Sequence, residues 1–294
     1  MPAIARPRRS VLYMPGSRSR ALEKARGLPA DALILDLEDA VIPEEKTAAR
    51  DLVCAALAEG GYGTRELIVR VNGLDTDWGA ADIEAAAKAG PEAILIPKVE
   101  SPEMIRDVAD RMAAAGAPEH TAIWAMMETP RGVLAAAEIA SSHDKLSGFV
   151  MGTNDLVKEL RAEHAPGRAP VMTALSMCLL AARANGLAAI DGVYNAFKDD
   201  DGLRAECEEG RAMGFDGKTL IHPAQLAIAN EVFGPSAEAL SEAREQLAAF
   251  EQVAASGGGV AVVNGRIVEN LHVETARRLI AEAEAIEGLA TAAE

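Results

Sequence analysis

Short apolar runs alternate along the chain with longer amphipathic segments, and the alternation recurs eight times before about residue 235. The apolar runs are nearly continuous, which is typical of strands that are buried on both faces in a parallel sheet covered by helices. The segments between them carry apolar residues three or four positions apart, the period of a helix that packs on one side. The eight predicted strands span residues 10–16, 32–40, 66–73, 93–99, 121–129, 146–156, 188–194 and 216–223.

Eight successive strand–helix units favour a closed TIM (β/α)8 barrel over an open, doubly wound sheet. The length agrees, because such a barrel takes about 250 residues and the chain has 294. The first predicted strand is not followed by a Gly-x-Gly-x-x-Gly segment, which argues against a dinucleotide-binding fold. We therefore predict a barrel over residues 1–234, with its active site at the carboxyl ends of the strands.

The pattern changes after about residue 235. A long amphipathic helix is predicted over residues 236–256, and a last helix over residues 273–286. Between them, two short β-prone runs flank Asn264 and Gly265, a dipeptide that strongly predicts a two-residue hairpin turn. Residues 235–294 are thus expected to form a separate helix–hairpin–helix extension rather than a ninth barrel unit.

Composition and charge narrow the class of protein. Hydrophobic residues make up 49% of the chain and aromatic residues only 3%, so an aliphatic globular core is expected. No apolar stretch reaches the roughly 20 residues that cross a membrane, and no apolar signal region follows the charged N-terminal segment. The net charge of −16 argues against nucleic acid as a partner. We expect a cytoplasmic protein that binds neither membranes nor nucleic acid.

The three cysteines give no sign of a disulfide framework or a metal clip. Cys54, Cys178 and Cys207 are odd in number and are not spaced as metal ligands. We expect them to be reduced and mostly buried, in agreement with a cytoplasmic location.

Polar side chains are concentrated at the predicted carboxyl ends of the strands, where the active sites of barrels lie. Glu128 ends the fifth predicted strand and Asp155 the sixth, so that neighbouring strands bring the two carboxylates together. Carboxylate oxygens and water are the ligands that Mg2+ prefers. We predict a Mg2+ site on this pair, with Mn2+ as an alternative ion. The competing interpretation is that both are acids at the start of a helix.

Arg70 lies within an otherwise apolar run, where an unpaired guanidinium would be costly. It is expected to form a buried ion pair with Asp36 or Glu38, to present a cation to a thioester carbonyl or a carboxylate, or to do both. The backbone N–H groups of residues 152–155 can either receive a carboxylate or belong to an ordinary turn. His222, which precedes a proline, is predicted to make a structural hydrogen bond rather than to act in catalysis.

Seven short motifs, in the same order, resemble the citrate lyase β-subunit-like family, which includes malyl-CoA and citramalyl-CoA lyases and malyl-CoA thioesterases. The resemblance extends from about residue 8 to about residue 275, and therefore covers nearly the whole chain. The motifs read SVLYMPGS, LILDLEDAV followed by Lys46 and Arg50, IVRVNG, ILIPKVE, METPRG, MGTNDL and GKTLIHP.

The resemblance implies a TIM barrel with a C-terminal extension, assembled as a homotrimer or homohexamer and acting on a small acyl-CoA. It implies Mg2+ on Glu128 and Asp155, and a coenzyme A thioester whose carbonyl is polarised by Arg70. The catalytic residues are expected to be Arg70, Glu269, Asp36 and Glu38. The residues expected to bind the substrate's carboxylate or its coenzyme A are Gly152, Thr153, Asn154, Arg8, Lys24 and Pro97.

The extension departs from the family's pattern. Many lyases of the family carry Gly-Lys-Met-Ile-Asp there, and the aspartate reaches the active site of a neighbouring subunit. This chain has Gly-Arg-Ile-Val-Glu at residues 265–269. Glu269 keeps the charge and adds a methylene, so it can take the aspartate's role or position a water molecule for hydrolysis. We expect the extension to be a lid that reaches a neighbouring subunit.

The main expectation is a Mg2+-dependent lyase that cleaves a 3-hydroxyacyl-CoA such as (S)-malyl-CoA to glyoxylate and acetyl-CoA, by a retro-Claisen reaction. Mg2+ would act as a Lewis acid on the hydroxyl and carboxylate, and the arginine would stabilise the enolate oxygen. The alternatives are a (3S)-malyl-CoA thioesterase, a citrate lyase β-type subunit acting on a carrier-bound acyl group, and an aldolase for free oxo-acids. A scaffold without activity is disfavoured by the polar strand ends.

Overall fold

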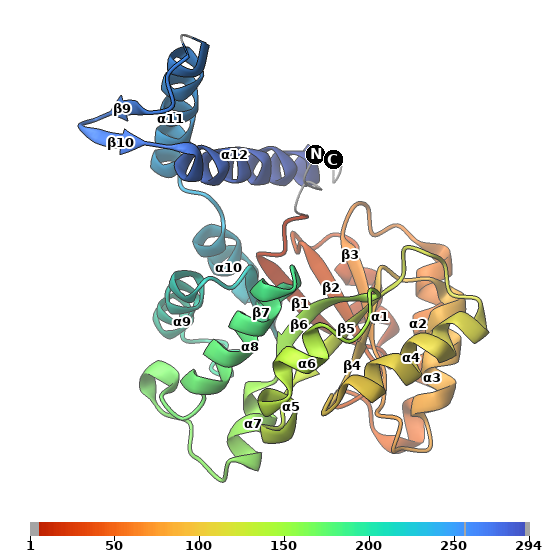
Figure 1. The fold of residues 1–294 in the computed structure, drawn as a ribbon. Coiled ribbons are helices and arrows are strands. Elements are labelled where there is room, and N and C mark those ends of the chain that lie inside the picture. Colours follow the sequence, from red (N-terminus) through yellow and green to blue (C-terminus); the bar gives the residue numbers. More distant parts are fainter. Residues whose placement is uncertain (1–5, 256, 292–294) are drawn as a thin grey trace. The chain divides into compact units, whose positions relative to one another are not determined.

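Eight parallel strands close into a barrel in the computed structural model, which describes residues 6–255 and 257–291 (Figure 1). Strands that are consecutive along the chain are neighbours in the barrel, and the eighth strand pairs with the first. The TIM-barrel prediction is therefore confirmed. The strands are β1 (Ser10–Pro15), β2 (Ala32–Asp36), β3 (Glu66–Arg70), β4 (Ala93–Ile96), β5 (Ala122–Met127), β6 (Leu146–Met151), β7 (Ala188–Asp191) and β8 (Gly217–Leu220).

Helices connect the strands and surround the barrel, as the amphipathic segments predicted (Figure 1). Two helices, rather than one, follow both the fifth and the sixth strand. The helices of this part are α1 (Ser19–Ala25), α2 (Lys46–Glu59), α3 (Gly79–Ala89), α4 (Pro102–Ala115), α5 (Pro130–Leu134), α6 (Ala136–Ala140), α7 (Thr153–Glu159), α8 (Met172–Ala184), α9 (Asp200–Met213) and α10 (Leu226–Phe233), with short 3-10 turns at Pro43–Glu45, Pro166–Arg168 and Pro223–Gln225.

Most of the strands end earlier than the apolar pattern predicted, because the chain leaves the sheet once polar residues begin. β2 ends at Asp36, so Glu38 lies in the following loop. β6 ends at Met151, and Asp155 lies in the first turn of α7 rather than on a strand. The carboxylates of the predicted site therefore come from loops and a helix start as well as from strand ends.

The interior of the barrel is filled by apolar side chains. Trp124 on β5 is fully buried there, and Gly148 on the neighbouring β6 leaves room for its indole ring. A Cβ atom at position 148 would lie 2.9 Å from Cε2 of Trp124. Because the interior is solid, reactive groups are confined to its rim. The core residues are Val11, Ala32, Ile34, Ile68, Ala93, Leu95, Trp124, Met126, Val150 and Ile190.

A buried charge network links β7, β8 and α9. Lys218 Nζ lies 3.0 Å from Oδ2 of Asp191 and 2.6 Å from Oε1 of Glu206. Arg168 Nη1 donates to both oxygens of Asp191, at 2.6 and 2.8 Å, and thereby holds the segment before α8. The side chains of Lys218 and Asp191 are completely buried, so water cannot solvate either charge if its partner is lost.

The second compact unit begins at residue 231 and contains α11 (Ala237–Ala255), β9 (Ala261–Val263), β10 (Arg266–Val268) and α12 (Asn270–Thr291). The two strands are antiparallel, and Asn264 and Gly265 between them have φ values of 49° and 75°, as a two-residue turn requires. The helix–hairpin–helix prediction is met. The units divide after residue 230, slightly before the predicted boundary at 234/235.

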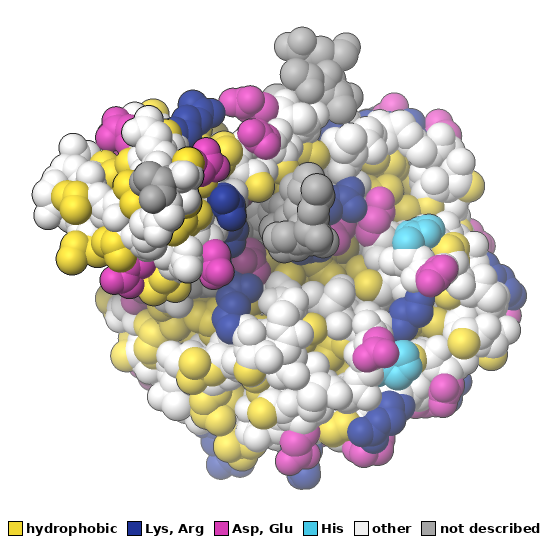
Figure 2. Space-filling model, turned by 45° about the horizontal axis from the view of Figure 1, so that its top comes forward, with side chains coloured by type: hydrophobic (Ala, Val, Ile, Leu, Met, Phe, Trp, Pro, Cys, Tyr) yellow, Lys and Arg dark blue, Asp and Glu magenta, His cyan; other side chains and the backbone are white. Residues whose placement is uncertain are grey.

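The cysteines lie mostly in the interior, as expected from the sequence. Cys54, Cys178 and Cys207 are free, and the latter two are buried. Among residues 6–255 and 257–291, no helix is long and apolar enough to cross a membrane. Figure 2 shows acidic and basic side chains interspersed on the face in view, so the negative net charge is not gathered there in one patch.

We predict that Lys218→Met destabilises the barrel strongly, because Asp191 and Glu206 would lose a buried partner. Removing one member of a buried ion pair costs about 3–5 kcal/mol of unfolding free energy. Urea unfolding measures this change. Lys88→Met is the control, since Lys88 pairs with Glu84 on an exposed face of α3 and little change is expected there. Equal stability of the two variants would contradict the role given to the buried network.

Candidate active site

A pocket of about 340 Å³ opens at the carboxyl ends of the barrel strands. Most of the predicted site residues meet there, although they come from segments far apart in the sequence. Aliphatic and aromatic side chains, among them Tyr13, Val193 and Ile221, complete the wall. The polar lining consists of Asp36, Asp39, Arg70, Glu128, Thr153, Asn154 and Asp155, with Gly152 between them.

Arg70 is held by a set of acidic partners on the second strand and its loop. Its Nε and Nη2 atoms each lie 2.7 Å from one oxygen of Asp36, and Nη1 lies 2.8 Å from Oε2 of Glu38. The buried ion pair predicted from sequence is therefore present. Burial alone would lower the pKa of Arg70, but Asp36, Tyr13 and Glu38 raise it well above its ordinary value. Arg70 thus remains a cation at the pocket wall.

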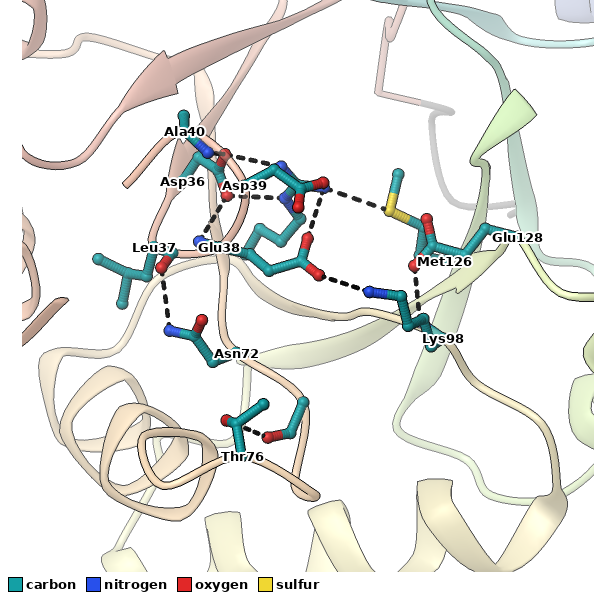
Figure 3. Close-up of polar contacts among 12 residues, drawn as sticks. Asp36, Leu37, Glu38, Asp39, Ala40, Asn72, Thr76, Lys98, Met126 and Glu128 are labelled. Carbon is teal, nitrogen blue, oxygen red and sulfur yellow. Dashed lines mark hydrogen bonds and ion pairs between the residues drawn. The ribbon is translucent and has the colours of Figure 1, made fainter. Parts of the chain in front are cut away.

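Asp36 also shapes the loop that carries Glu38. Its two oxygens accept hydrogen bonds from the backbone N–H groups of Glu38, at 2.9 Å, and Ala40, at 3.1 Å (Figure 3). The carbonyl of Leu37 is held in turn by Nζ of Lys46 and Nδ2 of Asn72, each at 2.9 Å. Sequence analysis missed this bracing, because it joins three segments and leaves no local pattern.

Glu128 and Asp155, the predicted metal pair, both line the pocket. Glu128 follows β5 and is almost fully buried, while Asp155 is half-buried. Gly152 is required between them, because a Cβ atom there would collide with the Glu128 carboxylate. Mg2+ commonly binds one or two carboxylates and completes its shell with water and substrate oxygens. The two carboxylates fit such an ion.

The site carries more negative than positive charge. Five carboxylates (Asp36, Glu38, Asp39, Glu128 and Asp155) surround two cations, Arg70 and Lys98. Burial first, and then Glu38 and Asp155, raise the pKa of Glu128 to about 8, although the backbone N–H of Lys98 opposes the shift. A bound divalent cation would offset this excess of negative charge.

Arg8 does not belong to this site, which corrects its prediction as a coenzyme A contact. It precedes β1, and its Nε atom lies 2.6 Å from Oε2 of Glu66, the first residue of β3. Both residues are at the amino ends of their strands, at the opposite end of the barrel. Arg8 forms an ion pair with Glu66 there, and the guanidinium of Arg8 lies 5.3 Å from the centroid of the Trp124 ring.

Four further predicted residues, Glu38, Lys24, Pro97 and Glu269, are outside the pocket lining, although Glu38 pairs with Arg70 at its wall. Lys24 is exposed in the last turn of α1, and Pro97 is buried just after β4. Glu269 is exposed in the second unit, where its backbone N–H donates to Nδ1 of His272. His222 accepts a hydrogen bond from the backbone N–H of Ala224 at 3.2 Å, which confirms the structural bond predicted for it.

A closed (β/α)8 barrel with carboxylates and a buried arginine at its catalytic end defines a TIM-barrel enzyme. The chain belongs to the HpcH/HpaI aldolase/citrate lyase family, whose sequence profile matches residues 9–223. The resemblance inferred from the seven motifs is therefore confirmed.

Curated relatives and solved structures refine this assignment. A (3S)-malyl-CoA thioesterase of Cereibacter sphaeroides is 60% identical over 282 residues, 96% of each chain. Citrate lyase subunit beta of Escherichia coli (strain K12) is 35% identical over 284 residues, 95% of this chain and 94% of that one. Protein CitE from Mycobacterium tuberculosis, solved with magnesium, acetoacetate and coenzyme A, is 30% identical with a TM-score of 0.76, over 95% of this chain and 98% of that one.

These relatives change the balance between the expected activities. The citrate lyase subunits support the family and an enzymatic role, but the thioesterase is much more similar to this chain. The alternative of thioester hydrolysis is thus better supported than the main expectation of a lyase. The structure of the M. tuberculosis protein contains magnesium and coenzyme A, in agreement with the predicted cofactor and substrate class.

We predict that metal binding at this site releases a proton. Because the pKa of Glu128 is about 8, its free carboxyl is protonated at neutral pH, and a metal ion binds only the deprotonated form. Mg2+ affinity should rise as the pH approaches about 8 and level off above it. Calorimetric titration in buffers of different ionisation enthalpy measures the released proton. Glu128→Gln should abolish the release, and a release that does not depend on pH would contradict the prediction.

Proposed function

We propose that this chain is a Mg2+-dependent thioesterase that hydrolyses (3S)-malyl-CoA to malate and coenzyme A. The 60% identity with a (3S)-malyl-CoA thioesterase, over 96% of both chains, is the observation that carries the proposal. The pocket supports it, because it combines a carboxylate pair for a divalent cation with a charged arginine.

The proposed roles follow from the geometry of the pocket. Mg2+, held by Glu128 and Asp155, would supply a Lewis acid for substrate oxygens. Arg70 faces the pocket from β3 and donates to the thioester oxygen, on which negative charge develops when water attacks the carbonyl. Asp36 and Glu38 keep Arg70 charged and oriented. In this proposal, the carboxylate of the malyl group binds at Thr153 and Asn154, beside Asp155.

The second candidate is the retro-Claisen lyase, favoured by the 35% identity with citrate lyase subunit beta. Both reactions place negative charge on the thioester oxygen, so Arg70 serves either of them. They differ in the bond that breaks. Hydrolysis breaks the carbon–sulfur bond and releases a free thiol, whereas the lyase breaks a carbon–carbon bond and releases glyoxylate.

A single assay with (3S)-malyl-CoA and Mg2+ distinguishes the two candidates. We expect free thiol and malate, detected with a thiol reagent, without glyoxylate, detected as its phenylhydrazone. Glu128→Gln should lower kcat/KM by more than about 100-fold, since residues that only support a metal ligand already cost about 10- to 100-fold. Glu84→Gln removes an exposed carboxylate of α3 and is the matched control. Glyoxylate without free thiol would establish the lyase instead.

We further propose that the enzyme is a homotrimer or homohexamer in which Glu269 of one subunit completes the site of another and positions the attacking water. Glu128→Gln and Glu269→Gln should each be inactive alone. Co-expressed in equal amounts, they should recover about one quarter of the wild-type activity, since half of the barrels and half of the Glu269 donors remain intact. A mixture no more active than its components would contradict a shared site.

A further inference from the structure

Lys98 has an unusual backbone conformation beside the pocket. It follows β4 and has a φ of 49°, in the left-handed region that residues other than glycine, asparagine and aspartate rarely adopt. Neighbouring Pro97 and Val99 are buried, whereas Lys98 itself is exposed at the carboxyl end of the barrel. Strained backbone of this kind persists where the surrounding structure requires it, often at a functional site.

The left-handed conformation directs the backbone N–H of Lys98 at Glu128. The N–H donates to Oε1 of Glu128 at 2.8 Å, and Figure 3 shows the two residues facing each other. The other oxygen, Oε2, lies on the side of Gly152, which lines the pocket with Asp155. The carboxylate is thereby oriented with one oxygen bonded to the backbone of Lys98 and the other beside Gly152 of the pocket lining.

The side chain of Lys98 turns toward another part of the site. Its Nζ atom lies 3.3 Å from Oε1 of Glu38 (Figure 3). The other oxygen of Glu38 pairs with Arg70. Burial lowers the pKa of Lys98, but Glu38, Glu128 and Asp155 together raise it above its ordinary value, so the ammonium stays charged. Lys98 thus contacts both sets of carboxylates. Its backbone N–H donates to Glu128 of the predicted metal pair, and its ammonium pairs with Glu38, a partner of Arg70.

We propose that Lys98 is a positioning residue of the divalent-cation site: its left-handed backbone holds Oε1 of Glu128 and leaves Oε2 directed at the cation. The proposal rests on the proposed metal-dependent function and adds a residue to it. A hydrogen bond from a residue that does not itself bind the metal can fix the orientation and charge of a metal ligand. Loss of such a hydrogen bond weakens metal binding by about 10- to 100-fold.

Two substitutions separate the backbone of Lys98 from its ammonium. Lys98→Gly removes the ammonium but readily keeps the left-handed conformation, because glycine has no Cβ. Lys98→Val also removes the ammonium but disfavours this conformation strongly, because its side chain is β-branched. The ratio of their metal affinities therefore reports the backbone contribution alone.

Mn2+ binding to the purified protein, followed by electron paramagnetic resonance without substrate, measures this ratio. We expect Lys98→Val to bind Mn2+ about 10- to 100-fold more weakly than Lys98→Gly. If circular dichroism shows that the valine variant does not fold, Lys98→Ala replaces it, with an expected ratio of about fivefold. Equal affinities of the folded glycine and valine, or glycine and alanine, variants would overturn the proposal.

Hydrolysis of (3S)-malyl-CoA by the wild-type protein separates this proposal from the proposed function. Equal Mn2+ affinities of the variants, in a protein that hydrolyses the thioester, overturn the role of Lys98 alone. The expected affinity ratio in a protein that releases no thiol supports Lys98 as a positioning residue and overturns the thioesterase. The ratio is thus informative whichever reaction the pocket performs.

Discussion

The ion pair between Arg70 and Asp36 determines the arrangement of the site. The two residues are direct partners in the register of β2 and β3, so the closed sheet itself places the guanidinium beside the carboxylate. Both side chains are nearly inaccessible to water, and either one alone would be a costly buried charge. Because Asp36 also accepts hydrogen bonds from the loop after β2, the same interaction positions Glu38.

The carboxylates of the site form two groups, the acids that pair with Arg70 or Lys98 and the predicted metal pair. Arg70 and Lys98 form ion pairs with the acids of the second strand and its loop, whereas Glu128 and Asp155 line the pocket itself. Glu128 is fixed from both sides, since one oxygen accepts the backbone N–H of Lys98 and the carboxylate packs against Gly152. Such rigid placement of a ligand reduces the reorganisation that a metal ion would otherwise require.

The sequence predicts those features that follow from burial and strand direction. The apolar runs predict the barrel, and a charged Arg70 inside one of them predicts an acidic partner. The position of Arg8 follows from the same rule, because a residue before a strand lies at the amino end, but its positive charge alone suggested a phosphate contact. The left-handed φ of Lys98 and the hydrogen bond of Lys46 to Leu37 depend on tertiary contacts. The residue type, lysine in both cases, predicts neither of them.

In the proposed function, the barrel residues alone do not select between hydrolysis and carbon–carbon cleavage. On the proposed mechanism, Arg70 stabilises the same thioester oxygen, whether the charge belongs to a tetrahedral intermediate or to an enolate. Selection then falls on the group that delivers a water molecule or moves a proton. At position 269 this chain has glutamate, whose carboxylate extends about 1.5 Å further than that of aspartate, the length of one carbon–carbon bond. Since catalytic proton transfers operate over about 2.6–3.2 Å between heavy atoms, a change of this length alters which atom the carboxylate can reach.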